Sequence, residues 1–507
     1  ANYTKQLFKE RDRLEVLLGY SYQQENWDGL GAGSSQFFTD LFLWNKLEAG
    51  NVARPPVSSS KGKNELGSYF GRINYSLLDK YLFTFSLRYD GSSKFGKNNK
   101  WGLFPSGAFA WKMQNENFLK DVDWLSELKL RVSFGQTGNS NIGGNAYEYY
   151  EAGNQYVFGD AVQTGSIKSQ LENPDLKWET TTELNVGLDF GFLNNRITGS
   201  FEYFHKVVSD LLAFRKLNSL MEVSTIADNI GATQSTGYEF SLNTVNLTGP
   251  FKWNTTLNIS SYKDRWKERN PDVVLAPYEK EDAPIRAIYG CVSDGILQIG
   301  ETPPASMPDL LPGQMKVKDL NGFDPNDGSK LLGHPDGKID AADRIYLGST
   351  DPKVIIGFGN MLEYKNFDLN IFFYGMFGQY VANSNRAKYG PSGCEYILQR
   401  QNYSKEVLER WTPDNPTNKF PSGFYSAYYG GDDWLLEKVS FVRCKNITLG
   451  YSFPHKWIHK VFSQARIYVD VENPFIITNY QGLDPEMDSK GGYPSQRTYS
   501  IGIDITF

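Results

Sequence analysis

A loop-forming stretch between residues 319 and 349 carries the residue types that bind calcium. Its oxygen-bearing candidates are Asp319, Asn321, Asp324, Asp336, Asp340 and Asp343. Calcium takes about six to eight oxygen ligands around a sharp turn, and Gly337 supplies a residue that permits such a turn. The segment 325–335 separates the two halves of the set, and Asp, Asn and Gly also form ordinary turns. The sequence therefore predicts a calcium site here, with plain turn formation as the alternative.

Aromatic residues gather in two other loop regions, 137–179 and 379–434. Flat rings stack on sugar faces and pack against apolar peptide side chains, so these regions suit the capture of a bulky solute. The alternatives are that the rings pack loops together, lie in a membrane-interface girdle or contact a partner protein. The predicted substrate-binding residues are Tyr147, Tyr149, Tyr150, Tyr156, Phe424, Tyr425, Tyr428, Tyr429 and Trp434.

Motifs for covalent catalysis are poor. His455 and His459 have the i, i+4 spacing of a zinc protease, but a lysine replaces the glutamate that such an enzyme needs between them. Residues 91–98 approach a phosphate-binding loop but lack its final Ser or Thr, and no helix pattern follows. Acidic pairs such as Asp432 and Asp433 are chain neighbours, whereas glycoside hydrolysis needs carboxylates opposed across a cleft. We predict that the protein is not an enzyme and requires no cofactor.

Composition excludes several further classes. The chain of 507 residues has a mean hydropathy of −0.47 and contains no uncharged apolar run long enough for a membrane helix. Aromatic residues make up 15% of the chain, which argues against disorder. A net charge of −6 disfavours nucleic acid as a partner. With 31 Tyr, 33 Phe and 48 Gly, the composition favours β-structure with many turns.

Apolar and polar residues alternate with a period of two along the whole chain, as in the final segment, where Tyr499, Ile501 and Ile503 are separated by Ser500 and Gly502. Many of these runs span about ten residues, which is the length that a tilted strand needs to cross a bilayer. Soluble strands average about five or six residues. About fourteen strands are predicted on this criterion, at residues 13–23, 67–77, 81–91, 101–112, 127–136, 180–193, 196–209, 233–245, 251–261, 353–364, 367–378, 435–453, 464–473 and 497–507.

The connections between the predicted strands tend to alternate in length. Short turns at 78–80, 194–195, 246–250 and 365–366 are interspersed with long loops such as 262–352. In an antiparallel meander this alternation gathers the long loops at one rim, as in outer-membrane barrels. A soluble sandwich would also explain the alternation of apolar and polar residues, but it gives no reason for the alternating loop lengths. The fold expected is therefore all-β, a transmembrane antiparallel β-barrel segment with long extracellular loops.

Several sequence blocks resemble one known family. Residues 81–96 read YLFTFSLRYDGSSKFG, residues 101–111 read WGLFPSGAFAW, and residues 128–139 read LKLRVSFGQTGN. They resemble the SusC/RagA family of TonB-dependent outer-membrane transporters, as do residues 176–204 and the final TYSIGIDITF. The resemblance implies a barrel of about 22 strands, a plug domain inside it and a SusD-like lipoprotein as a lid. It also implies import of oligosaccharides or peptides, energised through TonB, ExbB and ExbD.

The chain departs from this family pattern in its extent. It shows no TonB box and no plug, and about fourteen strands fall short of the family's number. We therefore expect residues 1–507 to be the C-terminal portion of a TonB-dependent barrel domain, whose plug and N-terminal strands lie outside this chain. Those missing strands are an expected partner, because unpaired strand edges in lipid cost several kcal/mol for each unsatisfied group. Members of the family also often have a contiguous acidic block at this place. In this chain, residues 325–335 interrupt the acidic block that begins at Asp319.

The function predicted is active import of a bulky nutrient, oligosaccharide or peptide, across the bacterial outer membrane. The alternatives are a surface receptor or adhesin barrel that binds without importing, and a soluble all-β carbohydrate-active protein. Outer-membrane lipids are expected around the apolar face of the strands. Polar residues expected to face the lumen are Arg88, Glu183, Asn185, Asp189, Glu202, Glu239, Asn243, Asp368, Asp470 and Glu472.

Overall fold

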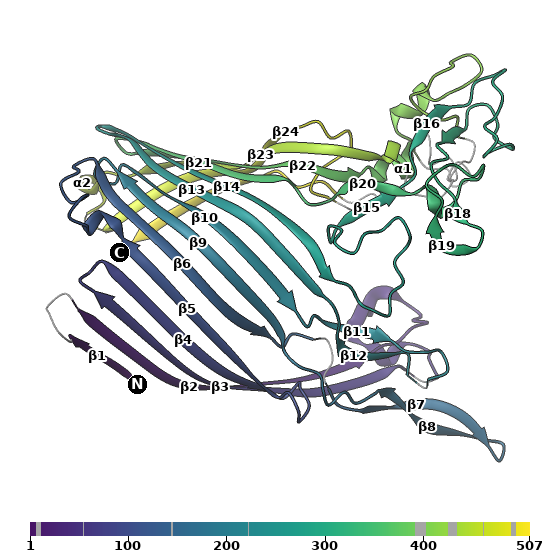
Figure 1. Cartoon of the computed structure of the whole chain (residues 1–507), viewed down its shortest axis with the longest axis horizontal. Helices are drawn as coiled ribbons and strands as arrows, with labels where there is room; N and C mark the ends of the chain where they lie inside the picture. Colours follow the sequence, from purple (N-terminus) through teal and green to yellow (C-terminus); the bar gives the residue numbers. More distant parts are fainter. Residues whose placement is uncertain are drawn as a thin grey trace. The chain divides into compact units, whose positions relative to one another are not determined.

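The chain folds into two compact units that consist mainly of strands. The computed structural model describes residues 1–6, 12–53, 55–142, 146–221, 223–390, 402–423, 433–459, 461–487 and 493–507. The first unit comprises Ala1–Phe109, Ser133–Glu183 and Val208–Gly231, and the second comprises Ala110–Val132, Leu184–Val207 and Ala232–Phe507. Figure 1 labels the strands, and in the second unit β21 to β24 run side by side.

Fifteen of the described strands form one sheet in which each strand pairs with its neighbours in the chain. They are β1 (Asn2–Gln6), β2 (Arg13–Ala32), β3 (Val57–Leu77), β4 (Tyr81–Ser92), β5 (Trp101–Lys112), β6 (Leu125–Asn139), β9 (Glu179–Phe192), β10 (Ile197–Ser209), β13 (Ala232–Thr248), β14 (Phe251–Glu268), β21 (Val354–Tyr364), β22 (Phe367–Ala382), β23 (Leu436–Ser452), β24 (Gln464–Thr478) and β25 (Thr498–Thr506). All fourteen predicted strands are present, and β1 is the addition. The prediction of a large antiparallel sheet is confirmed.

Large apolar side chains are exposed at alternate positions of strands in the main sheet. In β25, Tyr499, Ile501 and Ile503 are 69%, 76% and 64% exposed. In β4, Phe83 and Phe85 are 44% and 53% exposed on the face that carries the apolar residues. Large apolar side chains exposed in regular rows are unusual for a protein surface in water and are typical of a lipid-facing sheet.

Two strands are much longer than predicted. β2 and β3 contain 20 and 21 residues and pair without interruption from Arg13↔Ser76 to Ala32↔Val57. Their added halves, residues 24–32 and 57–66, are rich in Gly, Ser and charged residues and lack an apolar row. Backbone pairing with the neighbouring strand, which the period-two criterion does not detect, therefore extends both strands.

Short turns join the strands at one end of each predicted hairpin. Leu78 and Asp79 both have φ of 56°, and the amide of Leu78 donates to the Asp12 carboxylate over 3.0 Å. Positive φ at successive turn residues matches the right-handed twist of the flanking strands. The segment after β23 contains one short helix, α2 (His455–Ile458).

The long connections contain small hairpins and short helices. The additional strands are β7 (Tyr149–Phe158), β8 (Ala161–Gln170), β11 (Leu212–Lys216), β12 (Thr225–Asn229), β15 (Ala287–Gly290), β16 (Ser293–Ile296), β17 (Met315–Val317), β18 (Phe323–Asp324), β19 (Asp327–Leu331) and β20 (Ile345–Ser349). The additional helices are η1 (Asp40–Asn45), η2 (Leu47–Ala49), η3 (Met113–Asn115), η4 (Ala341–Asp343), α1 (Ser384–Tyr389), η6 (Lys405–Glu409) and η7 (Asp433–Leu435). Within the described ranges, the helices are all too short or too polar to cross a membrane.

Each unit has a buried apolar cluster next to its loops. In the first unit, the Trp178 ring packs against Phe95 and Phe104 at centroid distances of 5.0 and 5.5 Å. Phe95 is completely buried. In the second unit, Cys291, Leu297 and their neighbours form a separate buried cluster within the long connection between β14 and β21. These clusters hold the loops in defined conformations, because packed apolar side chains have few alternative arrangements.

Replacement of Phe95 by alanine should loosen the loops of the first unit. Removing a fully buried aromatic side chain costs about 3–5 kcal/mol. Hydrogen exchange should therefore accelerate at the amide of Ala146, which bonds to the Lys94 carbonyl over 2.8 Å. Phe158→Ala is the control, because that ring is 74% exposed and its loss should leave the exchange rate unchanged. Equal rates in the two variants would contradict the assignment of Phe95 to a stabilising core.

Candidate functional site

The first tyrosine group lies on and beside the β7–β8 hairpin. Gly159 and Asp160 form its two-residue turn with φ of 58° and 61°, between the paired residues Phe158 and Ala161. Tyr150 and Tyr156 are 62% and 54% exposed. They lie six positions apart on β7, or about 20 Å along an extended strand. The hairpin thus presents separate rings and does not gather them at one point.

Two tyrosines of this group have defined polar partners. The Tyr147 hydroxyl donates to the Phe95 carbonyl over 3.2 Å, which ties this ring to the core of the first unit. The Lys168 ammonium lies 5.7 Å from the centroid of the Tyr150 ring and 2.9 Å from the Glu148 carboxylate. A hydrogen bond with Glu148 raises the pKa of Tyr150 above its ordinary value. Tyr147 therefore has a structural role, although it is exposed like Tyr149, Tyr150 and Tyr156.

The second predicted aromatic group is only partly described. Phe424, Tyr425, Tyr428 and Tyr429 lie outside the described residues. Trp434 lies in η7 and is partly buried. The neighbouring Asp433 accepts a hydrogen bond from the Ser293 amide over 2.9 Å and thereby fastens η7 to the loop before β16.

Carboxylates of the acidic loop bind backbone amides and so join its two halves. Asp319 accepts hydrogen bonds from the amides of Asp336 and Gly337 over 3.3 and 2.8 Å. The segment that interrupts the acidic block contains the small β18–β19 hairpin. Gly322 is required where the halves meet, because a Cβ there would lie 2.4 Å from the Asp336 side chain. The loop therefore closes around the inserted hairpin.

Asp343 is the centre of this arrangement. It is completely buried, and its carboxylate accepts from the amides of Leu320, Asn321 and Asp340 over 2.7, 3.2 and 2.8 Å. Asp340 in turn caps η4 by accepting from the Ala342 amide over 2.7 Å. Four backbone amides thus donate to the carboxylates of Asp340 and Asp343, which the sequence analysis predicted to be calcium ligands.

The fit of the acidic loop to calcium is incomplete. Both oxygens of Asp319 and both of Asp343 already accept hydrogen bonds, which leaves fewer free lone pairs for a cation. In the part of the chain that the structure describes, no group of three His, Cys, Asp or Glu residues is arranged to hold a metal ion. Calcium binding at this loop stays a prediction.

On the polar face of the sheet, Arg131 of β6 connects neighbouring strands. Its guanidinium forms a two-pronged contact with Asp189 of β9 at 2.8 and 2.7 Å and reaches Glu202 of β10 at 2.8 Å. Asn185 completes the group by donating to Glu202 over 3.2 Å. Gly187 leaves the necessary room, because a Cβ there would lie 2.9 Å from the guanidinium. Three of the predicted polar-face residues therefore form one network.

A second arginine reaches across an intervening strand. Arg466 of β24 contacts Asp368 of β22 at 2.6 Å and Asp504 of β25 at 3.2 Å. β23 lies between β22 and β24, and its Gly450 allows the contact because a Cβ would lie 2.5 Å from both charged groups. The sequence analysis identified Asp368 but missed both arginines. The sequence signal that could have found them is an arginine in the polar row of one strand opposite an acidic residue in the polar row of another.

A third ion-pair group, also missed, fastens the loop after β24. Arg443 of β23 and Asp484 are 5% and 4% exposed and lie 2.6 Å apart, and Glu486 contacts the same guanidinium. Burial opposes ionisation of Asp484, but hydrogen bonds from Ser495 and Glu486 and the charge of Arg443 together lower its pKa below the ordinary value. The loop is therefore held by an ionised carboxylate.

Acid should release this loop from β23. A carboxylate with a lowered folded-state pKa stabilises the structure above its unfolded pKa of about 3.9, and this contribution disappears as the pH falls through the folded value. The Ser495 amide bonds to Asp484 over 3.0 Å. Its protection against hydrogen exchange, measured relative to the intrinsic rate at each pH, should be high at neutral pH and fall below about pH 4.

The variant Asp484→Asn should show the same release at neutral pH, because breaking a buried ion pair costs about 3–5 kcal/mol. Glu409→Gln is the matched control. Its partner Lys419 is 62% exposed, and such surface pairs contribute about 0–1 kcal/mol. Slow exchange at Ser495 in Asp484→Asn would show that the ion pair does not hold the loop.

Comparisons with known proteins show which family has this architecture. Residues 2–303 match the family described as TonB dependent receptor-like, beta-barrel. TonB-dependent receptor P3 of Formosa agariphila is 34% identical over 97% of this chain and 50% of its own length. TonB-dependent receptor SusC of Bacteroides thetaiotaomicron is 36% identical over 88% of this chain and 44% of its own length. The chain spans about half the length of the curated relatives it matches.

A solved structure agrees with these sequence matches. The RagAB peptide transporter aligns with 100% of this chain and 54% of its own chain, with a TM-score of 0.82 and 25% identity. The fold of this chain is thus similar over its whole length to that of the RagAB chain. The chain belongs to the TonB-dependent receptor-like β-barrel family and is an outer-membrane β-barrel protein of the SusC/RagA type.

Proposed function

We propose that the protein takes part in active import of a bulky nutrient, an oligosaccharide or a peptide, across the outer membrane. The observation that carries the proposal is the similarity of the whole chain to the RagAB peptide transporter, together with 36% identity to SusC over 88% of the chain. The relatives are named as receptors and a transporter, and the residues described here suggest binding and passage without covalent chemistry.

The parts of the chain would divide the work as follows. The apolar rows, such as Ile501 and Ile503 of β25, would contact lipid. The polar face, with the networks around Arg131 and Arg466, would line the interior and contact a plug domain supplied by residues outside this chain. The loops with their exposed tyrosines would meet the solute at the cell surface.

We also propose the partners that this mechanism needs. A SusD-like surface lipoprotein would cover the loops and trap the solute, and TonB with ExbB and ExbD would supply energy through the plug. Mass spectrometry of the complex isolated in mild detergent would identify such partners and any bound solute. The further N-terminal barrel strands that we expect to complete the sheet would appear in the same sample.

Deletion of TonB should abolish uptake and leave binding intact. Cells that depend on this protein for a bulky nutrient should stop accumulating the labelled solute, because the transporter can bind but cannot release it inward. The affinity of isolated outer membranes for the solute should stay within about twofold of the value for membranes from wild-type cells. Uptake that continues without TonB would contradict import energised by TonB, and a protein that binds but never imports would be a receptor or adhesin.

The prediction of calcium in the acidic loop has a direct test. Protein stripped with EDTA should release or absorb heat when titrated with calcium chloride, and Asp336→Asn should reduce that heat because it removes one charged ligand. Asp327→Asn, on the inserted hairpin, is the control. Heat equal to that of buffer alone would end the calcium proposal and leave the loop as a carboxylate–amide network.

A further inference from the structure

A pocket of about 680 Å³ opens in the second unit beside α1. Its wall is formed by α1, by residues 402–406 and by residues 481–483 and 493–494. This volume falls within the range of about 300–1,000 Å³ that is typical of small-ligand sites. The sequence analysis singled out the aromatic region 379–434, to which α1 and residues 402–406 belong, but it did not predict this pocket.

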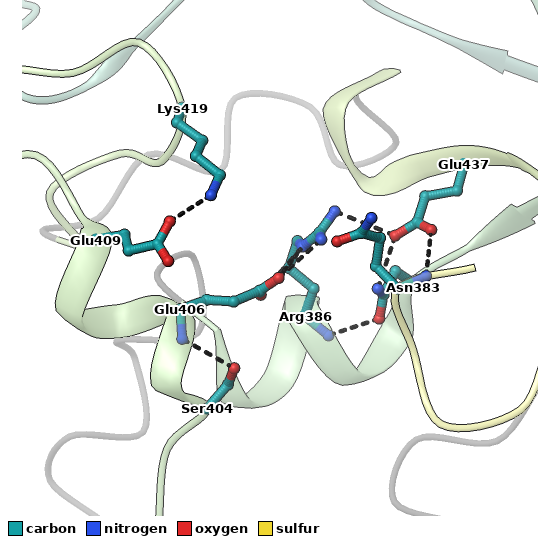
Figure 2. A network of polar contacts seen from close by, with 8 residues as sticks. Asn383, Arg386, Ser404, Glu406, Glu409, Lys419 and Glu437 are labelled. Atoms are coloured by element: carbon teal, nitrogen blue, oxygen red, sulfur yellow. Dashed lines mark hydrogen bonds and ion pairs between the residues drawn. The ribbon is translucent and has the colours of Figure 1, made fainter. Parts of the chain in front are cut away.

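The charged groups of the pocket are already paired with one another. The Arg386 guanidinium lies 2.8 Å from Glu406 and 3.1 Å from Glu437, and the Arg386 side chain is only 10% exposed (Figure 2). A buried guanidinium between two carboxylates has its charge neutralised at short range. With two carboxylates to one guanidinium, the group carries a net charge of −1 and disfavours an anionic ligand.

Glu437 of β23 also fixes the shape of the wall. Its carboxylate accepts hydrogen bonds from the Asn383 side chain and from the Gln481 amide, each over 2.8 Å. Figure 2 shows Asn383 and Arg386 converging on Glu437. Residues from α1, β23 and the loop after β24 are thus held together, so a ligand would meet a preorganised surface.

Uncharged polar groups remain for a ligand. Among the described residues, the Oδ1 atom of Asn385 is a buried acceptor without a hydrogen-bond partner. An unsatisfied buried acceptor costs about 1–3 kcal/mol, and a ligand hydroxyl that donates to it removes this cost. The wall also includes the side chains of Asn402 and Gln481. Side-chain amides carry both donors and an acceptor, a combination that matches the hydroxyls of a sugar.

An exposed aromatic ring borders the same pocket. Tyr493 is 87% exposed, so its ring makes little contribution to packing within the protein. Such a ring can stack on the apolar face of a pyranose. A peptide would instead bring charged termini and apolar side chains, for which this wall offers mainly Leu483 and Pro494.

We propose that this pocket binds one uncharged sugar ring of a neutral oligosaccharide. The proposal rests on the proposed function, because it makes an oligosaccharide the imported solute. Asn385 and Gln481 supply hydrogen bonds to the hydroxyls, and Tyr493 supplies the stacking surface. The Arg386–Glu406–Glu437 group holds the wall and disfavours an anionic sugar.

The test measures binding by calorimetry to the protein purified from outer membranes in detergent. The probes are neutral hexasaccharides of glucose, mannose, galactose and xylose, a sulfated hexasaccharide, and a hexapeptide with blocked termini. At least one neutral sugar should bind. Tyr493→Leu should weaken that binding about tenfold and Tyr493→Phe should preserve it, because only the ring is needed for stacking. Asn385→Ala should also weaken binding about tenfold.

The control is Asn326→Ala, an exposed asparagine on the inserted β18–β19 hairpin outside the pocket, which should bind the sugar like the wild type. Correct folding of each variant is checked by its heat-modifiable gel shift. The proposal is overturned if the peptide or the sulfated sugar binds and no neutral sugar does, if none of the probes binds, or if Asn385→Ala and Tyr493→Leu leave sugar affinity unchanged. Those results would refute sugar binding at this pocket and would not affect the proposal of TonB-dependent uptake. If the sugar binds but its uptake does not require TonB, the proposed import is refuted and the pocket proposal stands.

Discussion

Backbone amides and carbonyls that face lipid can bond only to one another, and this constraint explains most of the chain. It requires strands to pair with their neighbours within the membrane, and fifteen of the described strands are paired in this way in one sheet. Because the backbone is satisfied in this way, side chains on one face are free to be apolar and those on the other to be polar. The loops beyond the strand ends are bound by no such rule, and the inserted hairpins are found there.

Much of the sheet could be predicted from sequence, because apolar alternation and backbone pairing act in the same direction. The strands near Tyr81 and Thr498 show this most clearly, with an apolar residue at every second position. The outer halves of β2 and β3 lack that pattern and could not be found. Their pairing depends on the neighbouring strand, and a single stretch of sequence does not contain that information.

The binding chemistry was harder to predict, because residue type does not reveal which partner a side chain takes. Asp319 and Asp343 are of a residue type that binds metal ions, yet the carboxylates of both accept hydrogen bonds from backbone amides. Arg386 and Glu437 lie far apart in the chain and carry no motif, but together they shape a pocket wall. Loop side chains gain their roles from contacts between distant segments, which periodicity and local motifs do not encode.

The contact of Arg466 across Gly450 has a consequence for how the last strands align. The guanidinium links β22, β24 and β25, while β23 provides the opening through which it passes. A slip of one residue in any of these strands would turn its side chains to the opposite face. It would then separate Arg466 from an acidic partner or place a side chain in the opening at Gly450. The alignment of the final strands is thus fixed by charge and by the absence of a Cβ at Gly450, in addition to the apolar face, which alone would permit slips of two residues.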